Sequence, residues 1–377
     1  MSKIVYVCYY STERNPRHIS PAGVTLGGYV IDSISRLGKA LTVFSPAQST
    51  TGCEIERQIE PLNDKATAIF MKCFKKYGRK NLPMRFIQKI KRERELEKEL
   101  DSLIENGDTV IVYHSLSLMN VITKLRKKKS FKLILQVAEI YADVTENKKI
   151  RKKEIDYIKG ADKYIFISRL LQDSLGIEND RAIVCSGAYK TIEKTVEPKN
   201  DDKTHIVYAG TLDTTKGGAY YAVSCGKFLD DKYAIHILGF GSEAQKNQLN
   251  KLIEETKKET KCAISYDGCL SGEEYTRFLQ CCHIGLSTQN PQGAYNDTSF
   301  PSKILVYLAN GLRVVSVKIP AIENSPVGKV MYFYEDCNSA SIAEAIKSIK
   351  LNEDYDSRRL IKILDMEFMT AIDKLIK

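Results

Sequence analysis

Several features that would assign this chain of 377 residues to other protein classes are missing from its sequence. No apolar run approaches the roughly 20 residues that a membrane-spanning helix needs. The opening segment, MSKIVYVCYYS, predicts a short strand rather than a signal peptide. The ten cysteines form no C-x-x-C pair, which favours buried thiols in a reducing compartment over disulfides or a metal site. We therefore expect a cytoplasmic protein.

Modules that recognise nucleic acid are also missing. The formal net charge is +10, which by itself is compatible with polyanion binding. However, the sequence contains no zinc-finger spacing, no aromatic RNP-like strand and no basic-region heptads. We expect no specific nucleic-acid partner.

The chain is long enough for two domains that each bury a core. In the first half, apolar runs that predict strands alternate with helical patterns, as in a doubly wound α/β domain. These strands are expected at residues 3–9, 40–44, 109–113, 132–138 and 163–167. A polar stretch at 191–205 is a plausible hinge. The expected domains are therefore 1–195 and 196–350, followed by a helical tail over 351–377.

The most informative segment runs from His205 to Gly218, HIVYAGTLDTTKGG. An apolar strand leads into a glycine turn, and Lys216 follows six residues after Gly210. Without a Cβ at Gly210 the backbone can approach a ligand closely. The helix expected after Gly217 would add free N–H groups and its positive dipole end. This pattern favours a phosphate site, although a glycine turn between strand and helix is routine in α/β proteins.

Two later segments extend the pattern. Residues 233–243, YAIHILGFGSE, repeat the order of strand and glycine turn, and residues 296–317 predict a loop, a helix and a buried strand. Three ligand-facing turns would then share one parallel sheet. At the predicted helix start, Ser302 and Lys303 could bind a diphosphate through hydroxyl, backbone and charge. The alternative is an ordinary Ser N-cap beside a solvated lysine.

Taken in this order, the segments resemble the carboxyl-terminal half of GT-B glycosyltransferases, specifically the retaining group-one family that uses nucleotide-sugar donors. Matching residues of the first turn are Gly210, Leu212, Lys216 and Gly217. Thr211 stands where that family usually has arginine. The turn at Gly239 to Gly241 resembles the second glycine loop of the family, and residues 266–288 resemble the strand, short helix and strand that follow it.

The resemblance implies two Rossmann-like doubly wound domains facing a central cleft, with a last helix that crosses back to the amino-terminal domain. It implies a hexosyltransferase that moves a sugar from a nucleotide-sugar donor, UDP-sugar being the expected one, to an acceptor hydroxyl, with retention and without a metal or another cofactor. Lys216, the helix N-termini and Lys303 would stabilise the leaving diphosphate.

The sequence departs from the family at an acidic motif. Two glutamates eight positions apart are usual, but Thr298 and Val306 occupy those places here, and valine cannot accept a hydrogen bond from a ribose. Either Asp297 or Glu243 holds the ribose in place of the missing glutamate, or the protein no longer transfers sugar. The predicted donor-binding residues are Gly210, Thr211, Lys216, Gly239, Gly241, Glu243, Asp297, Thr298, Ser302 and Lys303.

Candidate residues in the amino-terminal half follow predicted strands, where open α/β sheets bind ligands. His114 follows the run TVIVY and Glu139 follows KLILQVA, and with Lys216 they are the expected catalytic residues. Gly27 and Gly28 are expected directly before a helix near 27–38, as a loop that approaches phosphate or acceptor. The alternatives are that His114 is a packed or solvated residue without a catalytic role, and that Gly27 and Gly28 only shape a tight turn.

A basic amphipathic segment is expected at 66–100. From Lys72 to Lys98 there are eleven Lys/Arg and three Glu, interleaved with bulky apolar residues. Such a segment can lie on an anionic membrane surface, or it can be a helix packed on its own domain with a solvated charged face. The first interpretation places the protein on the inner face of the membrane and suggests a glycan or lipid-linked acceptor, as in polysaccharide biosynthesis.

Two other function classes remain open. A non-catalytic GT-B protein that regulates a partner transferase would explain Thr211, Thr298 and Val306. A sugar-nucleotide epimerase of the same fold would act on the donor without an acceptor.

Overall fold

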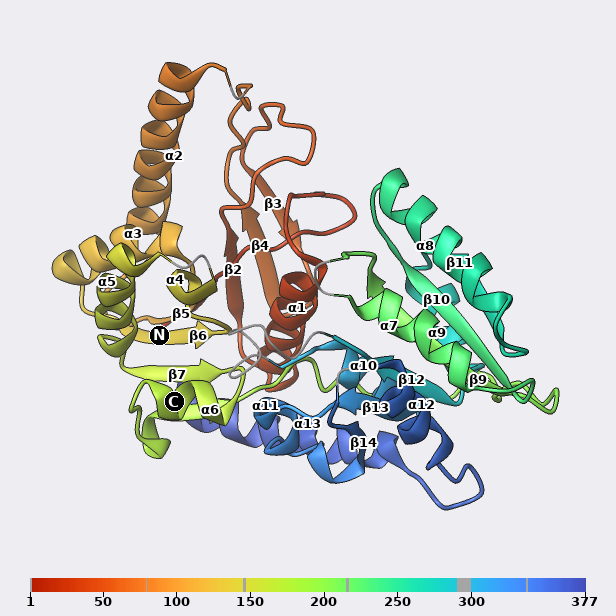
Figure 1. The fold of residues 1–377 in the computed structure, drawn as a ribbon. Helices are drawn as coiled ribbons and strands as arrows, with labels where there is room; N and C mark the ends of the chain where they lie inside the picture. The colour runs from red at the N-terminus through yellow and green to blue at the C-terminus, as the bar shows by residue number, and fades with distance from the viewer. Residues whose placement is uncertain (1, 79, 145–146, 215–216, 290–299, 337) are drawn as a thin grey trace. The chain divides into compact units, whose positions relative to one another are not determined.

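The computed structural model describes residues 2–78, 80–144, 147–214, 217–289, 300–336 and 338–377, and the chain divides into two compact α/β units (Figure 1). The first unit comprises Met1–Ala188 together with Glu367–Lys377, and the second comprises Tyr189–Met366. Among the described helices, none is both long and apolar enough to cross a bilayer.

The first unit is built on an eight-stranded sheet in the order β3-β4-β2-β1-β5-β6-β7-β8. Every pairing is parallel except that of β3 with β4. The strands are β1 (Ile4–Val7), β2 (Leu41–Ser45), β3 (Gln58–Pro61), β4 (Ala66–Phe70), β5 (Thr109–Tyr113), β6 (Lys132–Val137), β7 (Lys163–Phe166) and β8 (Ala182–Val184). The order reverses between β1 and β5, which is where doubly wound sheets open a ligand crevice.

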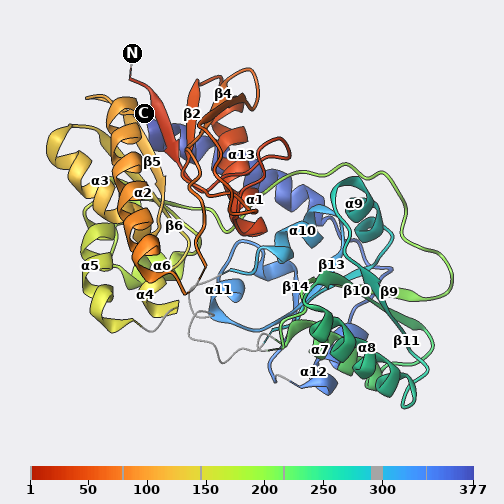
Figure 2. The ribbon, with the colours of Figure 1, turned by 90° about the horizontal axis from the view of Figure 1, so that it is seen from above.

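Helices connect these parallel strands. They are α1 (Pro21–Arg36), α2 (Leu82–Leu103), α3 (Leu116–Lys128), α4 (Tyr141–Val144), α5 (Lys148–Lys159) and α6 (Arg169–Ser174). The final helix, α13 (Ser357–Ile376), begins in the second unit and ends in the first. There the Phe368 ring lies 5.1 Å from that of Tyr29 on α1, and Lys132 donates to the Leu375 carbonyl at 2.7 Å. Figure 2 shows α13 beside α1.

The start of α1 corrects one sequence prediction. The Ser20 hydroxyl accepts a hydrogen bond from the amide of Gly23, and Pro21 occupies the first helical position, a combination that favours a helix N-terminus. Gly27 and Gly28 therefore lie inside α1 rather than in a loop before it. A Cβ at Gly27 would lie 3.7 Å from the Tyr6 hydroxyl, an ordinary van der Waals distance, so the packing of α1 on β1 does not itself require glycine there.

The predicted basic segment is also shorter than expected. Residues 66–70 form β4, and all of them except Thr67 are buried. The strand pairs with β2 on one side and β3 on the other, so this part of the segment belongs to the sheet rather than to an amphipathic helix. The helical part is α2, which begins after Asn81, whose side chain accepts a hydrogen bond from the amide of Met84.

The second unit has a fully parallel six-stranded sheet in the order β11-β10-β9-β12-β13-β14. Its strands are β9 (Thr204–Thr211), β10 (Tyr233–Phe240), β11 (Ala263–Gly268), β12 (Ile284–Ser287), β13 (Arg313–Val317) and β14 (Met331–Tyr334). Its helices are α7 (Gly218–Ser224), α8 (Glu243–Lys257), α9 (Gly272–Gln280), α10 (Lys303–Ala309), α11 (Pro320–Glu323) and α12 (Ser339–Lys347). This strand order reverses between β9 and β12, so the second unit is a doubly wound sheet as well.

Candidate functional site

The carboxyl ends of β9 and β10 form a glycine-rich edge. Gly210 on β9 is paired in register with Gly239 on β10. A Cβ at Gly239 would lie 2.0 Å from the Gly210 carbonyl oxygen, and one at Gly241 would lie 2.9 Å from the Leu212 Cβ. A larger residue at either position would force its neighbours to shift, so Gly239 and Gly241 allow the two turns to approach each other closely.

The turn into α7 also requires glycine. Gly217 has a φ of +69°, a left-handed conformation that favours glycine, and it caps α7. A Cβ at Gly218 would lie 2.5 Å from the Tyr208 hydroxyl and 2.6 Å from the Thr288 carbonyl oxygen. The Thr288 hydroxyl donates to the Gly218 carbonyl at 2.7 Å, which ties the start of α7 to the end of β12. The turn is thus fixed from both sides of the strand-order reversal.

Lys303 lies directly over this edge. It is the first residue of α10, and its Nζ is 4.1 Å from the centroid of the Tyr208 ring. A Cβ at Gly210 would come within 3.0 Å of the same Nζ. Tyr208 is buried, and burial raises the pKa of its hydroxyl well above the usual range, so it stays protonated. The structure therefore brings together two residues predicted from sequence, Gly210 and Lys303.

Other predicted donor residues lie apart from this group or outside the described residues. Glu243 is exposed at the start of α8, and its carboxylate pairs with Lys246 at 2.8 Å. Ser302 is exposed and its side chain makes no capping hydrogen bond to the described part of α10, and Thr211 is exposed. Val306 is half-buried on α10. Lys216, Asp297 and Thr298 are not among the described residues.

In the first unit, His114 follows β5 but its side chain is fully buried. Its Nε2 lies 2.7 Å from the Glu154 carboxylate, which also accepts hydrogen bonds from the amides of Tyr141 and Ala142 at 2.8 Å each. Burial acts to raise the pKa of Glu154, but these hydrogen bonds outweigh it and hold the pKa below its usual value. His114 thus links the end of β5 to α4 and α5.

Tyrosines surround this pair. The His114 ring lies 5.6 Å from that of Tyr141 and 5.8 Å from that of Tyr157. Glu139, the other predicted residue, is half-buried after β6, and its charge contributes to the raised pKa of Tyr113 and Tyr141, for which burial is the main cause. For Tyr113 the pKa rises to about 12. These phenols therefore remain hydrogen-bond donors at neutral pH.

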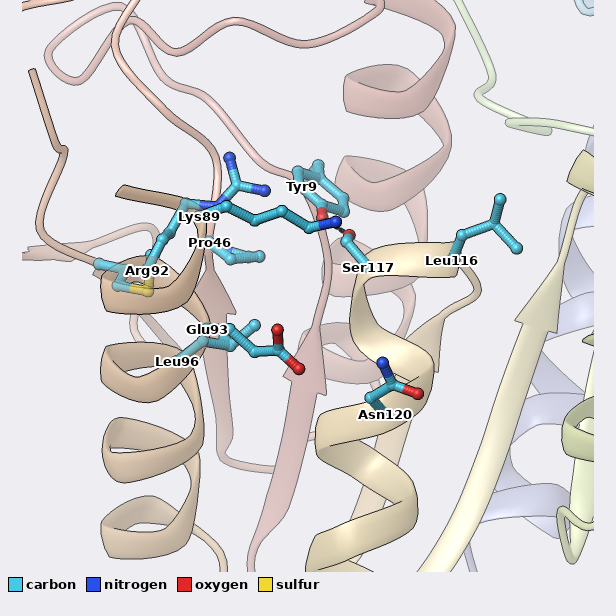
Figure 3. Close-up of a pocket in the computed structure, with 10 residues that line it drawn as sticks. Tyr9, Pro46, Lys89, Arg92, Glu93, Leu96, Leu116, Ser117 and Asn120 are labelled. Carbon is cyan, nitrogen blue, oxygen red and sulfur yellow. Dashed lines mark hydrogen bonds between the residues drawn. The ribbon is translucent and has the colours of Figure 1, made fainter. Parts of the chain in front are cut away.

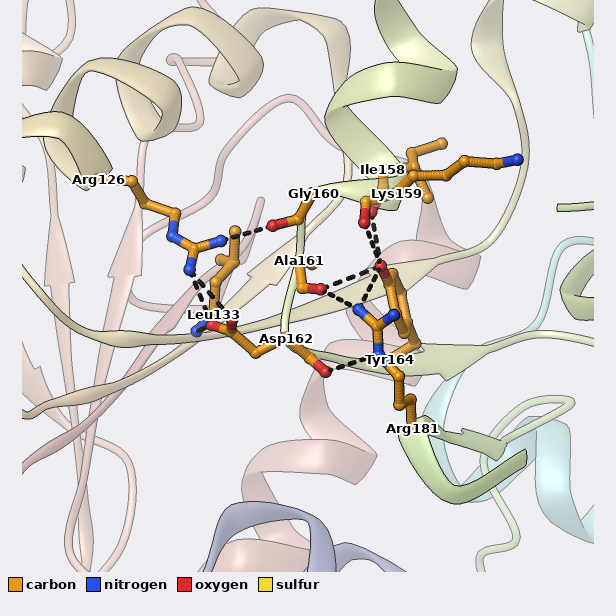
Figure 4. A network of polar contacts seen from close by, with 9 residues as sticks. All are labelled: Arg126, Leu133, Ile158, Lys159, Gly160, Ala161, Asp162, Tyr164 and Arg181. Carbon is orange, nitrogen blue, oxygen red and sulfur yellow. Dashed lines mark hydrogen bonds and ion pairs between the residues drawn. The ribbon is translucent and has the colours of Figure 1, made fainter. Parts of the chain in front are cut away.

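A network of hydrogen bonds and an ion pair just before the amino end of β7 holds α5 in place (Figure 4). Arg126 donates to the Gly160 carbonyl at 2.6 Å and to the Asp162 carboxylate at 3.1 Å. Arg181 donates to the Ala161 carbonyl at 2.6 Å, and its guanidinium lies 5.4 Å from the centre of the Tyr164 ring. These contacts fix the carboxyl end of α5, the helix that carries Glu154 to His114.

The first unit also contains a pocket of about 320 Å³ that the sequence did not reveal (Figure 3). It lies between α2, the start of α3 and the carboxyl ends of β1, β2 and β4. Its lining residues are Tyr9, Pro46, Met71, Lys89, Arg92, Glu93, Leu96, Leu116, Ser117 and Asn120. The Tyr9 and Ser117 hydroxyls are hydrogen-bonded to each other, which joins the two sides of the strand-order reversal. This is the edge at which a doubly wound sheet binds ligands.

No protein-family model and no curated protein matches the sequence. The structure, however, matches solved structures over its whole length. They include the apo structure of OtsA (TM-score 0.71, 10% identity), a trehalose-6-phosphate protein from E. coli bound with UDP-2-fluoro glucose (0.69, 11%) and sucrose-phosphate synthase from Thermosynechococcus elongatus (0.70, 11%). The alignments cover 100% of this chain and 98 or 99% of the others.

Agreement over the full length at this level of identity shows the fold. The chain has the GT-B fold, made of two Rossmann-like α/β units, and the fold class predicted from the sequence is confirmed.

Proposed function

We propose that this chain is a nucleotide-sugar-dependent glycosyltransferase that uses a UDP-sugar. The observation that carries the proposal is the position of Lys303 over Gly210 and Tyr208, at the strand-order reversal of the second sheet. A positive charge beside a glycine turn at this edge suits a diphosphate. The E. coli protein with the same fold, described as bound with UDP-2-fluoro glucose, supports the choice of ligand.

The chemistry that we propose is electrostatic. As the glycosidic bond to the nucleotide breaks, negative charge develops on the leaving diphosphate, and a lysine already held in position stabilises it without reorganising. Lys303 supplies this charge, and Lys216, six residues after Gly210 in the sequence, is assigned the same role. We assign retention of configuration and independence from metal to the reaction as part of the proposal.

The acceptor belongs to the first unit in this proposal, at the carboxyl edge of its sheet. Glu139 follows β6 there and is the candidate catalytic carboxylate. His114 is assigned a positioning role, because its buried ring bonds Glu154, which in turn holds the backbone of Tyr141. The acceptor that we propose is a hydroxyl of a lipid-linked precursor of a polysaccharide.

Val306 supports a second candidate function. A half-buried valine cannot bind a ribose hydroxyl, and Glu243 is engaged by Lys246. A GT-B protein that has lost donor binding and regulates a partner transferase would tolerate this substitution.

Incubation with UDP-glucose, followed by product analysis, tests the proposal. A transferase releases UDP and, with water as a poor acceptor, free sugar at a slow rate. Lys303→Ala should lower this rate at least tenfold, whereas Lys232→Ala, an exposed lysine before the amino end of β10, should not change it. Release of an epimerised nucleotide sugar would point to an epimerase. Absence of any product would favour the regulatory function.

A further inference from the structure

Helix α2 packs along only part of its length. In its carboxyl-terminal half, Leu96 and Leu100 are buried, and Ile104 after the helix is buried as well. In its amino-terminal half the large apolar side chains are exposed: Leu82 is 66% exposed, Phe86 65% and Ile87 45%. In Figure 1 this half of α2 extends away from α3 and α5. Side chains of this size on a water-exposed helix indicate a surface that binds something.

The exposed apolar side chains gather on one side of the helix. Leu82, Phe86 and the half-buried Ile90 recur every four residues, so they lie one above another, and the exposed Ile87 lies next to them. Pro83 occupies the first turn, where it does not disturb helical hydrogen bonding. We call residues 82–90 the α2 tip.

The α2 tip stands in a strongly basic stretch. Residues 73–92 contain eight Lys/Arg and no Asp or Glu. Elsewhere on the surface lysines are commonly paired, as Lys124 and Lys128 are with Glu97. In the described part of this stretch no lysine or arginine forms an ion pair; the cations concerned are Lys75, Lys76, Lys80, Arg85, Lys89, Lys91 and Arg92. Their charge remains available to an external anion.

The same helix lines the pocket of the first unit. Lys89, three residues after Phe86, and Arg92 belong to its wall. In Figure 3 the Lys89 side chain extends from α2 toward Ser117, whereas Glu93 extends toward Asn120. The end of the pocket near Ser117 therefore offers an ammonium group and the Tyr9 and Ser117 hydroxyls, a combination that suits a phosphate group.

We propose that the α2 tip docks on the surface of a bilayer containing anionic lipids and that the adjoining pocket takes the phosphate of an amphiphilic acceptor embedded there. Exposed Leu and Phe beside unpaired cations fit a membrane interface, where apolar side chains enter the headgroup region and cations meet lipid phosphate. The pocket's place at the ligand edge of the sheet puts that phosphate where the acceptor is expected. The acceptor role of the pocket rests on the proposed glycosyltransferase function, whereas docking does not.

Flotation of the full chain with vesicles tests the docking. Vesicles of equal parts phosphatidylglycerol and phosphatidylcholine should bind it, and vesicles of phosphatidylcholine alone should bind it far less. Phe86→Ser with Ile87→Ser should lower the partition coefficient at least tenfold. Phe228→Ser, which removes an aromatic ring of the second unit that is 48% exposed, is the control and should leave binding unchanged. Changing any one cation of the α2 tip to glutamine should lower the partition coefficient about fivefold.

Equal flotation of the tip variant and the control would overturn the docking, and so would no binding to the anionic vesicles. The latter result would leave an acidic protein surface as the occupant of the tip. Because the substituted side chains are exposed, the variants should keep the thermal unfolding midpoint of the wild type, and that measurement accompanies the assay.

Calorimetric titration with dodecyl phosphate below its micellar concentration tests the pocket. Lys89→Gln with Arg92→Gln should weaken binding about tenfold or more. Lys91→Gln with Arg94→Gln removes the same charge from residues of α2 that do not line the pocket, and should have a much smaller effect. An equal loss of affinity for dodecyl phosphate in the two double variants would show nonspecific attraction and overturn the assignment. Inorganic phosphate that binds as tightly as the amphiphile would overturn it as well. None of these readouts involves sugar transfer, so they stand or fall separately from the transferase function.

Discussion

The ammonium group of Lys303 lies 4.1 Å from the centre of the Tyr208 ring. The two residues belong to different elements, α10 and β9, and they meet at the strand-order reversal of the second sheet. A cation over an aromatic face is stabilised by the quadrupole of the ring, so Tyr208 helps hold the lysine beside the Gly210 turn. The proposed diphosphate site depends on this arrangement.

Removing the ring should therefore weaken nucleotide binding without removing the charge. Tyr208→Leu is expected to lower the affinity for UDP by about threefold to thirtyfold, the range of a lost cation–π contact. Tyr208→Phe keeps the ring and is the matched control, with an affinity near that of the wild type. Fluorescence or calorimetric titration measures both. Equal affinity in Tyr208→Leu and the wild type would separate Tyr208 from the site.

Gly239 should be intolerant of substitution for a packing reason. In Gly239→Ala the new Cβ would lie 2.0 Å from the Gly210 carbonyl oxygen, so the paired strands must move apart. We expect a loss of about 2 kcal/mol in the free energy of unfolding. Gly78→Ala is the control, because a Cβ there meets nothing within 4 Å. Urea unfolding of both variants measures the difference, and similar midpoints would show that the strand ends are more adaptable than we infer.

The buried Glu154 should stabilise the first unit. Glu154→Ala leaves His114 and the amides of Tyr141 and Ala142 without their shared acceptor, and we expect it to cost about 3 kcal/mol or more. Glu97→Ala breaks the surface pairs with Lys124 and Lys128 and should cost about 1 kcal/mol or less. Chemical denaturation compares the two. A small effect at Glu154 would contradict its role as the link between β5, α4 and α5.

Acid should destabilise the second unit through His205 and His283. Burial is the main cause that lowers the pKa of each below the ordinary value, and the His283 Nδ1 accepts a hydrogen bond from the His205 amide at 3.0 Å. Since the folded-state pKa lies below that of the unfolded chain, the unfolded chain binds more protons as the pH falls below about 6.5. Stability is therefore fully present above that pH and is lost below it.

A non-titrating replacement tests this pH dependence. His283→Asn keeps an acceptor oxygen near the His205 amide but cannot be protonated in this range. Its denaturation midpoint should fall less than that of the wild type between about pH 7 and about pH 5. Parallel pH profiles would assign the acid sensitivity to other groups.

The sequence was sufficient to predict the fold because alternating apolar runs and glycine turns are local signals. Strands β1, β5, β6 and β7 fall within the expected ranges, and β2 ends one residue beyond its expected range of 40–44. Gly27 and Gly28 were misplaced because a glycine pair suggests a turn, whereas the Ser20 cap and Pro21 already begin the helix. A Cβ at either position would make only ordinary van der Waals contacts with Tyr6 or Tyr10, so the packing does not explain why these residues are glycine.

Site residues were predictable where they follow strands and not where distant segments meet. His114 was found at the end of β5, but its burial depends on Glu154, 40 residues later in the chain. The pocket combines Tyr9 after β1, Arg92 on α2 and Ser117 on α3, and no local pattern connects these separate elements. Since Tyr9 and Ser117 both follow strands next to the strand-order reversal, their position was the one available signal.

The most direct test of the proposed function is a calorimetric titration of UDP, with GDP, ADP and CMP for comparison, into the wild type, Lys303→Ala and Lys232→Ala. The account predicts saturable binding of UDP that Lys303→Ala weakens at least tenfold and Lys232→Ala leaves unchanged. Failure of all four nucleotides to bind, or one affinity shared by all three proteins, would contradict it.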